Sequence, residues 1–279
     1  MRKKITIVGA GRVGETTAHI LADRALGDFV LVDVVPNLAE GKALDLMQLR
    51  PLAGADVSIT GTTGFEATRG SDVVVVTSGM PRKPGESRED LLRKNIAIVK
   101  PVAEEIKRTS PDAILIMVAN PLDTMTWVAR SVTGWPRERV FGMAGVLDTA
   151  RLRTFIAMEL GCSVKDVNAF VLGGHGDEMV PVVRYASVGG IPIEKLLPKD
   201  RIDAIVKRTR GAGGGGGGHG AGRAPRREAR AAVLGAAFGR VRRPRPVPGR
   251  PGDARGPRCR EGARGRARAR REGDARGLD

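Results

Sequence analysis

Along residues 4–133, short apolar runs alternate with longer stretches in which apolar positions recur at helical spacing. The apolar runs read KITIVGA, FVLVDV, ADVSIT, DVVVVTSG and AILIMVANP, and the stretches 12–25, 37–50, 87–109 and 122–133 have the spacing of amphipathic helices. Each run is apolar on both faces, which is typical of a parallel sheet covered by helices on each side. This order of elements predicts an α/β fold with a doubly wound parallel sheet.

A different pattern begins after the segment RVFGMAG. The spacing predicts a helix over residues 147–160, two short strands around a glycine-rich turn in VNAFVLGGHGDEMVPVVRYASV, and a helix from about residue 199. Helical spacing persists to Arg210, where the composition changes abruptly. These elements predict a smaller, incomplete α+β domain whose last helix is interrupted.

The last 69 residues have a composition that the rest of the chain does not share. Residues 211–279 contain 18 Arg, 18 Gly, 13 Ala and 6 Pro, and they lack Lys, Ser, Thr, Ile, Tyr and Trp. Because so few apolar side chains cannot offset the entropy lost on ordering, we expect a disordered tail. The formal net charge of +16 is concentrated there, since the tail carries +12 and residues 1–210 only +4.

The segment GAGRVG lies between the first predicted strand and the first predicted helix. Gly9, Gly11 and Gly14 permit a tight turn and a close approach of a pyrophosphate to the helix N-terminus. Asp33, 19 residues after Gly14, ends the second strand, where a carboxylate can accept hydrogen bonds from ribose hydroxyls and would repel a 2′-phosphate. The segment therefore predicts binding of NAD rather than NADP.

Three further segments carry side chains suited to a small acidic substrate. The loop TSGMPRKPGESRED contains Arg82 and Arg88, which can bind carboxylates in a planar fork, although a solvated basic loop is the alternative. In GVLDTARLR, Asp148 and Arg151 share one helix face, as a surface ion pair also would. His175 in GGHGDEM is either a general acid/base oriented by Asp148 or an incidental turn residue.

These motifs together resemble the malate and lactate dehydrogenases, and within them the bacterial malate dehydrogenases. The resemblance rests on TIVGAGRVG, LVDVV, RKPGESREDLLRKN, VANPLD, VLDTARLR and GGHGDEMVP, in this order. It implies a Rossmann NAD-binding domain in residues 1–145, a partial substrate domain in residues 146–210 and the tail in residues 211–279. It also implies an NAD-dependent oxidoreductase that interconverts malate and oxaloacetate by hydride transfer, a reaction of the tricarboxylic acid cycle.

The resemblance assigns roles to the residues around the substrate. It implies that His175 donates and accepts the proton and that Asp148 orients it. Arg151 would bind the carboxylate beside the reacting carbon, and Arg88 would polarise the carbonyl and stabilise the developing alkoxide. Asn120 would contact the substrate.

Substrate choice in this family depends on the position of Arg82, where arginine accompanies malate and glutamine accompanies lactate. Burying the second carboxylate of oxaloacetate without a cation would cost about 1–3 kcal/mol or more, and Arg82 would supply that cation. Malate is therefore the favoured substrate, and lactate dehydrogenase is the alternative. On the cofactor side, the resemblance implies contacts from Asn95. No metal is expected.

The expected partners are a small dicarboxylic substrate and, in intact family members, further copies of the chain. An alternative function is an NAD-binding body whose basic tail binds nucleic acid non-specifically through phosphate contacts. The tail has one Phe and no Tyr or Trp for base stacking, which argues against that function.

Cys162 and Cys259 lie on opposite sides of the compositional boundary, so a disulfide between them is not expected. No apolar leader or long apolar run is present. A cytoplasmic location without membrane contact is therefore expected.

The tail has the features of a GC-rich gene translated out of frame. Synonymous codons for residues 241–251, VRRPRPVPGRP, can be chosen so that a shift of one base encodes YGVRDLYLGVP. Only the middle base of each shifted codon is free in this choice, and the result resembles a strand that family members carry in this part of the chain. We therefore expect a frameshift after about Arg210, and an activity impaired by the altered C-terminus.

Overall fold

The computed structural model describes residues 2–81, 85–176 and 178–213. Arg82 and the predicted disordered tail from residue 214 onward, including Cys259, lie outside the described residues. Within the described ranges, no helix is both long and apolar enough to cross a membrane.

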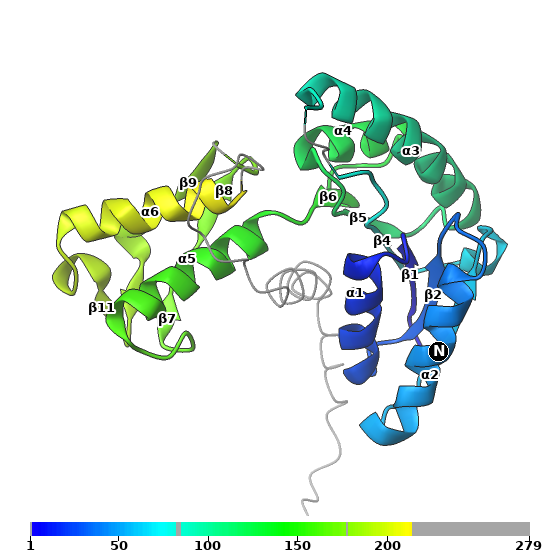
Figure 1. Cartoon of the computed structure of the whole chain (residues 1–279), viewed down its shortest axis with the longest axis horizontal. Coiled ribbons are helices and arrows are strands. Elements are labelled where there is room, and N and C mark those ends of the chain that lie inside the picture. Colours follow the sequence, from blue (N-terminus) through cyan, green and yellow to red (C-terminus); the bar gives the residue numbers. More distant parts are fainter. Residues whose placement is uncertain (1, 82–84, 177, 214–279) are drawn as a thin grey trace, which may run out of the picture. The chain divides into compact units, whose positions relative to one another are not determined.

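Strands and helices alternate along the first part of the chain (Figure 1). The strands are β1 (Lys4–Val8), β2 (Asp28–Val32), β3 (Ile59–Thr62), β4 (Val73–Val76), β5 (Ile114–Met117) and β6 (Val140–Gly142). The α-helices are α1 (Arg12–Asp23), α2 (Leu38–Ala53), α3 (Arg88–Thr109) and α4 (Leu122–Thr133), with a 3-10 turn η1 (Glu66–Thr68) before β4. We refer to residues 2–144 as the six-stranded region.

The six strands form one sheet in the order β3-β2-β1-β4-β5-β6, and every pairing is parallel. The order reverses between β1 and β4, which is the switch point at which open α/β sheets bind ligands. This topology confirms the predicted doubly wound sheet.

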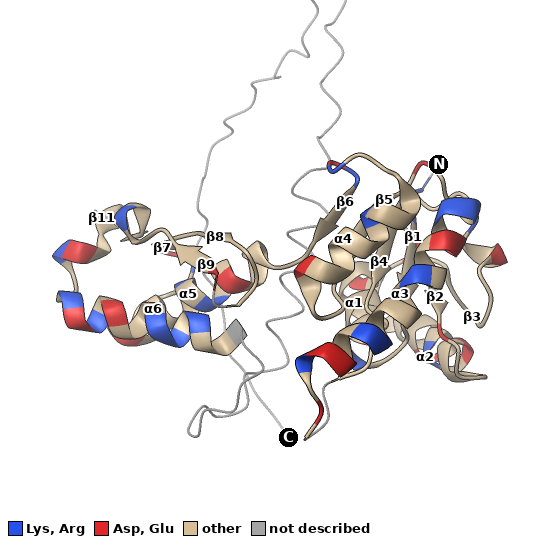
Figure 2. Ribbon diagram, turned by 90° about the horizontal axis from the view of Figure 1, so that it is seen from above, with Lys and Arg blue, Asp and Glu red and all other residues tan. Residues whose placement is uncertain are grey.

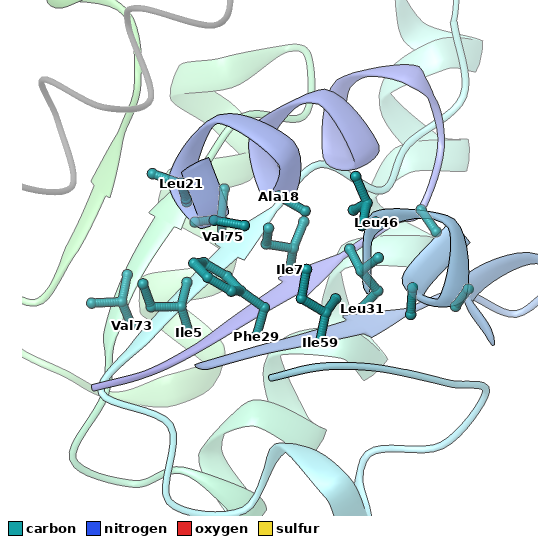
Figure 3. Packing of buried hydrophobic residues seen from close by; sticks show 14 of the residues in the cluster. Ile5, Ile7, Ala18, Leu21, Phe29, Leu31, Leu46, Ile59, Val73 and Val75 are labelled. Carbon is teal, nitrogen blue, oxygen red and sulfur yellow. The ribbon is translucent and has the colours of Figure 1, made fainter. Parts of the chain in front are cut away.

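Alternate residues of each central strand pack into two separate cores. Ile5 and Ile7 of β1 pack with Leu21 of α1 and with α2 on one face (Figure 3). Val74 and Val76 of β4 belong to the other core, together with buried residues of α3 and α4. Because helices cover both faces, both side-chain sets of a strand must be apolar, as the sequence pattern indicated.

The remaining described residues, 145–213, form what we call the C-terminal region. Its elements are α5 (Gly145–Leu160), β7 (Val167–Asn168), β8 (Val171–Gly173), β9 (Met179–Pro181), η2 (Val183–Tyr185), β10 (Ser187–Val188), β11 (Ile191–Pro192), η3 (Ile193–Lys195) and α6 (Lys199–Gly213). Strands β8 and β9 form the predicted hairpin around the glycine-rich turn, and β11-β10-β7 form a second small sheet. Residues such as Ile156 of α5, Met179 of β9 and Ile205 of α6 share one core.

One face of the β8–β9 hairpin is apolar and exposed. Val171 and Met179 point into the core of the C-terminal region, whereas the cross-strand partners Leu172 and Val180 are 58% and 52% exposed. The exposed ring of Tyr185 stacks on Phe170 beside them, with centroids 6.0 Å apart. In the described chain, this region therefore covers only one face of its hairpin.

Two expectations require correction. The third strand was predicted within residues 55–60, but β3 starts at Ile59. The chain leaves α2 at Gly54, which has a left-handed conformation, and it pairs with β2 only from Ile59 onward. The last helix extends past Arg210 to Gly213. Of the two tryptophans, Trp135 is buried beneath Arg139, whereas Trp127 is 66% exposed.

Charged residues of both signs are mixed along the helices of both regions (Figure 2). Several form exposed ion pairs, such as Lys199 with Asp203 on α6 and Arg93 with Glu89 on α3. Such pairs contribute little stability individually because water and salt screen them. The mixture agrees with the near-neutral charge of residues 1–210.

Candidate active site

The turn between β1 and α1 packs so tightly that two of its positions require glycine. Gly9 has a φ of +100°, and a Cβ there would lie 2.7 Å from Thr77 Oγ1 and 2.8 Å from Ser78 N. A Cβ on Gly14 would overlap the carbonyl oxygen of Gly9. The strand, the turn and the first helical turn are therefore held in close backbone contact, with Thr77 Oγ1 donating a hydrogen bond to Gly9 O at 2.9 Å.

Gly11 and Asp33 lie at the same end of the sheet, where Gly11 suits an anion and Asp33 suits a ribose. Gly11 is the N-cap of α1 and offers no side-chain cap, and a Cβ on it would meet no atom within 4 Å. No Gly11 side chain therefore caps the first N–H groups of α1, and such uncapped N–H groups at a helix N-terminus suit a pyrophosphate. Asp33 accepts hydrogen bonds from Ala10 N at 2.7 Å and from Val35 N at 3.0 Å, which fix its carboxylate beside the turn. These residues fit an NAD molecule.

A buried carboxylate organises the residues expected to carry the chemistry. Asp148 in the first turn of α5 is 1% exposed, and its two oxygens contact different side chains. Asp148 Oδ2 lies 3.0 Å from His175 Nδ1, and Asp148 Oδ1 accepts a hydrogen bond from Arg151 Nη1 at 2.9 Å. Since His175 and Arg151 are each only 13% exposed, this is a shielded three-residue cluster rather than a surface ion pair or an incidental turn.

Arg151 keeps one edge of its guanidinium available. Its Nη1 is occupied by Asp148, its Nε is buried without a hydrogen-bond partner, and its Nη2 bonds to no described residue. A buried donor without an acceptor is unfavourable in a finished site. The edge formed by Nε and Nη2 has the geometry that accepts a carboxylate through two parallel hydrogen bonds.

A pocket of about 730 Å³ brings several of the predicted residues together. It is lined by Arg88 at the start of α3, by Asn120 after β5 and by His175 on the β8–β9 turn. Apolar side chains of Val13, Met80, Leu91, Val118 and Leu122 form much of the remaining wall. A mostly apolar pocket with a few convergent polar groups is the usual form of a small-molecule site.

The side chain of Asn95, for which the resemblance implies a place on the cofactor side, bonds to the backbone of two loops. Its side chain is 1% exposed, and Oδ1 accepts a hydrogen bond from Met80 N at 2.8 Å. Its Nδ2 donates to Asn120 O at 2.6 Å and to Met80 O at 3.2 Å. Both amide hydrogens are therefore engaged with backbone, and Asn95 joins the loop after β4 to the loop after β5.

Arg88 begins a helix whose N-terminus is capped. Asp90 N donates to Ser87 Oγ at 3.0 Å, and Asp90 Oδ2 accepts from Ser87 N at 3.3 Å, which is a capping box. The hydroxyl of Ser87 lowers the pKa of the Asp90 carboxyl by donating a hydrogen bond to it. Arg88 itself forms no ion pair with a described residue, so its guanidinium is free for a ligand.

Asp123 is a further residue of the site, for which the sequence motifs predicted no role. Asp123 in VANPLD lines the pocket, and its Oδ2 accepts a hydrogen bond from the main-chain N of His175 at 3.1 Å. The two residues are 52 positions apart, so no local pattern indicates their contact. Within the described ranges, no group of three or more His, Cys, Asp or Glu side chains could hold a metal ion.

The fold and the site together define a dinucleotide-dependent dehydrogenase: a glycine turn at the switch point of a parallel sheet, and an imidazole, a carboxylate and a free guanidinium edge for the substrate. Residues 3–142 match the NAD-binding domain of the lactate/malate dehydrogenases, and residues 145–215 match the alpha/beta C-terminal domain of the same proteins. The chain belongs to the lactate/malate dehydrogenase family.

Among curated relatives, the malate dehydrogenase of Roseiflexus sp. (strain RS-1) is 58% identical over 214 residues, which cover 77% of this chain and 69% of the relative. The malate dehydrogenase of Bacillus subtilis (strain 168) is 55% identical over 215 residues, with 76% and 69% covered. Among solved structures, the apo malate dehydrogenase of Picrophilus torridus has a TM-score of 0.74 and 51% identity, covering 76% of this chain and 68% of that one. The lactate dehydrogenase of Cryptosporidium parvum with lactic acid and cofactor has a TM-score of 0.72 and 41% identity, with 76% and 68% covered.

Proposed function

We propose that the chain carries the catalytic residues of an NAD-dependent malate dehydrogenase, which interconverts malate and oxaloacetate. The observation that carries the proposal is the Asp148 carboxylate, which contacts both His175 Nδ1 and Arg151 Nη1. The relatives named above as malate dehydrogenases support malate as the substrate.

His175 exchanges the substrate proton in this proposal. When malate is oxidised, its hydroxyl proton passes to His175 Nε2 while the hydrogen on the same carbon leaves as hydride. NAD, when bound, supplies the acceptor for that hydride, and NADH supplies the donor in the reverse direction. Asp148 fixes the tautomer with the proton on Nδ1 and stabilises the imidazolium that forms, in the way a buried aspartate acts in hydrolytic triads.

Three further side chains bind and polarise the substrate. The free Nε and Nη2 edge of Arg151 binds the carboxylate next to the reacting carbon. Arg88 lines the pocket, where its charge would stabilise the oxyanion that develops on the carbonyl oxygen. The exposed side chain of Asn120 lines the same pocket and is available as a hydrogen-bonding partner for the substrate.

Selection of malate over lactate remains a proposal about Arg82, which lies outside the described residues. Its cation would pair with the second carboxylate of oxaloacetate. In an active enzyme, Arg82→Gln should shift the preference from oxaloacetate toward pyruvate. The measurement is kcat/KM for both substrates, and an unchanged ratio would remove Arg82 from this role.

We also propose that residues from about 211 onward are encoded out of frame and that this impairs turnover. The family match ends at residue 215, close to the compositional change, and the chain covers 69% of the first relatives' length. A pocket open to water weakens the electrostatic stabilisation that this chemistry requires. The nucleotide sequence around codons 211–218 tests the frameshift directly, and an unshifted frame there relative to close relatives would refute it.

The catalytic proposal is tested by comparing the full chain with a version whose reading frame is restored by one base. Both should bind NADH, measured by fluorescence, because residues 2–144 contain the glycine turn. Only the restored chain should oxidise NADH rapidly with oxaloacetate, and His175→Gln should abolish most of that turnover. Full turnover by the 279-residue chain would contradict the impairment, and an active His175→Gln variant would contradict the assigned chemistry.

Self-association is a further part of the proposal. Helix α2 exposes several apolar side chains, Leu44, Met47, Leu49 and Leu52, the last of which is 86% exposed. An apolar helix face of this kind is typical of an interface between subunits. Light scattering of the purified chain gives the oligomeric state, and a monomer at all concentrations would contradict this role for α2.

We place the protein in the cytoplasm. Cys162 is a free thiol in the described part of the chain, which suits a reducing compartment. Fractionation of the source cells, followed by immunodetection, tests the location, and recovery outside the cytoplasm would contradict it.

A further inference from the structure

The turn that carries His175 has little conformational preference of its own. Gly173 has a φ of +86° and Gly176 a φ of +106°, so the segment has glycine on both sides of the catalytic imidazole. Glycine populates a wide range of backbone conformations, so such a turn does not by itself hold a side chain in one direction. The direction of the His175 ring must therefore be set by contacts from outside the turn.

Two carboxylates make those contacts, one at the ring and one at the backbone. Asp148 contacts ring atom Nδ1 at 3.0 Å, and Asp123 Oδ2 accepts the hydrogen bond from His175 N at 3.1 Å. Among the described residues, Asp123 provides the side-chain hydrogen bond to the main chain of residues 174–176. Gly174 permits this approach, since a Cβ there would lie 3.4 Å from Asp123 Oδ2 and 3.0 Å from Glu178 Oε2.

The position of Asp123 is itself fixed by buried neighbours. Asp123 lies in the first turn of α4, where a carboxylate is favoured by the helix dipole. Leu122 and Met125 on either side are 4% and 0% exposed and belong to the core of the six-stranded region. The loop before α4 is held by the hydrogen bond from Asn95 Nδ2 to Asn120 O at 2.6 Å.

We infer that Asp123 is a positioning residue that fixes the His175 backbone, so that the imidazole is presented to the pocket with Nδ1 on Asp148. The inference rests on the proposed role of His175. Asn95 joins the loop after β4 to the loop before α4, and Asp123 joins the start of α4 to the catalytic turn. Asp123 acts through His175 and transfers no proton itself.

The test uses the full chain and a spectroscopic readout that does not depend on turnover. Nuclear magnetic resonance measures hydrogen exchange at His175 N and the downfield proton of His175 Nδ1, which is assigned by its loss in His175→Gln. Asp123→Ala should accelerate exchange at His175 N about tenfold, because a hydrogen bond to a charged acceptor is lost, and should broaden the ring proton. Asp123→Asn keeps an acceptor oxygen and should restore both signals close to those of the parent chain.

Asp112→Ala, which removes an exposed aspartate without a side-chain hydrogen bond to a described residue, is the matched control and should leave both signals unchanged. Exchange at Ile116 reports on the sheet and should be the same in all variants. The inference is overturned if both His175 signals in Asp123→Ala equal those of the parent chain. It is also overturned if Ile116 exchange accelerates as much as His175 exchange, because that result describes general destabilisation. The proposed function is tested separately, by the turnover of the frame-restored chain, so its failure is distinguishable from the failure of this inference.

Discussion

The six-stranded region and the C-terminal region bury their apolar side chains to different extents. In the first region, strands such as β4 have all their side chains buried, because helices pack on both faces of the sheet. In the second, the β8–β9 hairpin buries Val171 and Met179 but leaves Leu172 and Val180 more than half exposed. One region has two complete cores, and the other has a single core beneath one face of its hairpin.

Because of this difference, cofactor binding and proton transfer depend on regions that are buried to different extents. The dinucleotide site is made mostly of backbone within the six-stranded region, at the turn around Gly9 and Gly11 and beside Asp33. The acid/base cluster of Asp148, Arg151 and His175 belongs to the region with less burial. We therefore expect cofactor binding to tolerate damage to the C-terminal region, and catalysis to be sensitive to it.

The largest expected effect comes from a core substitution in each region. Ile156→Ala removes a fully buried side chain of α5 and should cost about 2–5 kcal/mol. Hydrogen exchange should then show lost protection in residues 145–213, while NADH binding and protection of β1 persist. The matched variant Ile116→Ala, also fully buried, should instead weaken the sheet and NADH binding. Simultaneous loss of protection in both regions for either variant would show that they unfold as one unit.

Two helical glycines provide the next test. Gly14→Ala places a methyl group on the Gly9 carbonyl oxygen and should weaken NADH binding by about 10–100-fold. Gly41→Ala meets no atom within 4 Å and should stabilise the chain by about 0.5–1 kcal/mol without changing NADH affinity. Fluorescence titration and thermal unfolding measure the two effects. Equal NADH affinity in the two variants would refute the close packing described for the turn.

The exposed hairpin face predicts a smaller effect, on association rather than on folding. The double substitution Leu172→Lys and Val180→Lys should change stability by less than about 0.5 kcal/mol, because both side chains are already exposed. It should reduce aggregation, measured by light scattering, because an apolar patch becomes charged. Leu52→Lys on α2 serves as the comparison: it should change the oligomeric state without reducing this aggregation, and an equal reduction in aggregation would contradict the role of the hairpin face.

The smallest expected effect is a pH dependence at the edge of the sheet. Partial burial opposes ionisation of Asp72, but hydrogen bonds from Lys3 Nζ at 2.6 Å and Lys4 N at 2.9 Å hold the pKa of Asp72 below its ordinary value of 3.8. The ionised carboxylate therefore contributes stability above about pH 4, and this contribution is lost as the pH falls through the lowered pKa. Asp72→Asn should remove less than about 1 kcal/mol at pH 7 and flatten the stability profile at acid pH. An unchanged acid limb in urea unfolding would contradict this account.

Local patterns in the sequence predicted most of the six-stranded region. Apolar runs such as VVVV of β4 and the glycines before α1 depend on neighbours in the chain, so they indicate strands, helices and the dinucleotide turn directly. The start of β3 was predicted wrongly, because it depends on how distant segments pack. Of the candidate site residues, the sequence indicated His175, Asp148 and Arg151, although it left a surface ion pair and an incidental turn as alternatives.

By itself the sequence determined the fold class, the glycine turn and the set of candidate residues, since each is encoded within one short segment. Tertiary structure decided which of these residues meet: Asp148 and His175 are 27 positions apart, and Asp123 and His175 are 52 apart. It also decided that Asn95 directs both amide hydrogens to backbone carbonyls. The physical reason is that burial and hydrogen bonding between distant segments follow from the packing of whole helices and strands, which no local period describes.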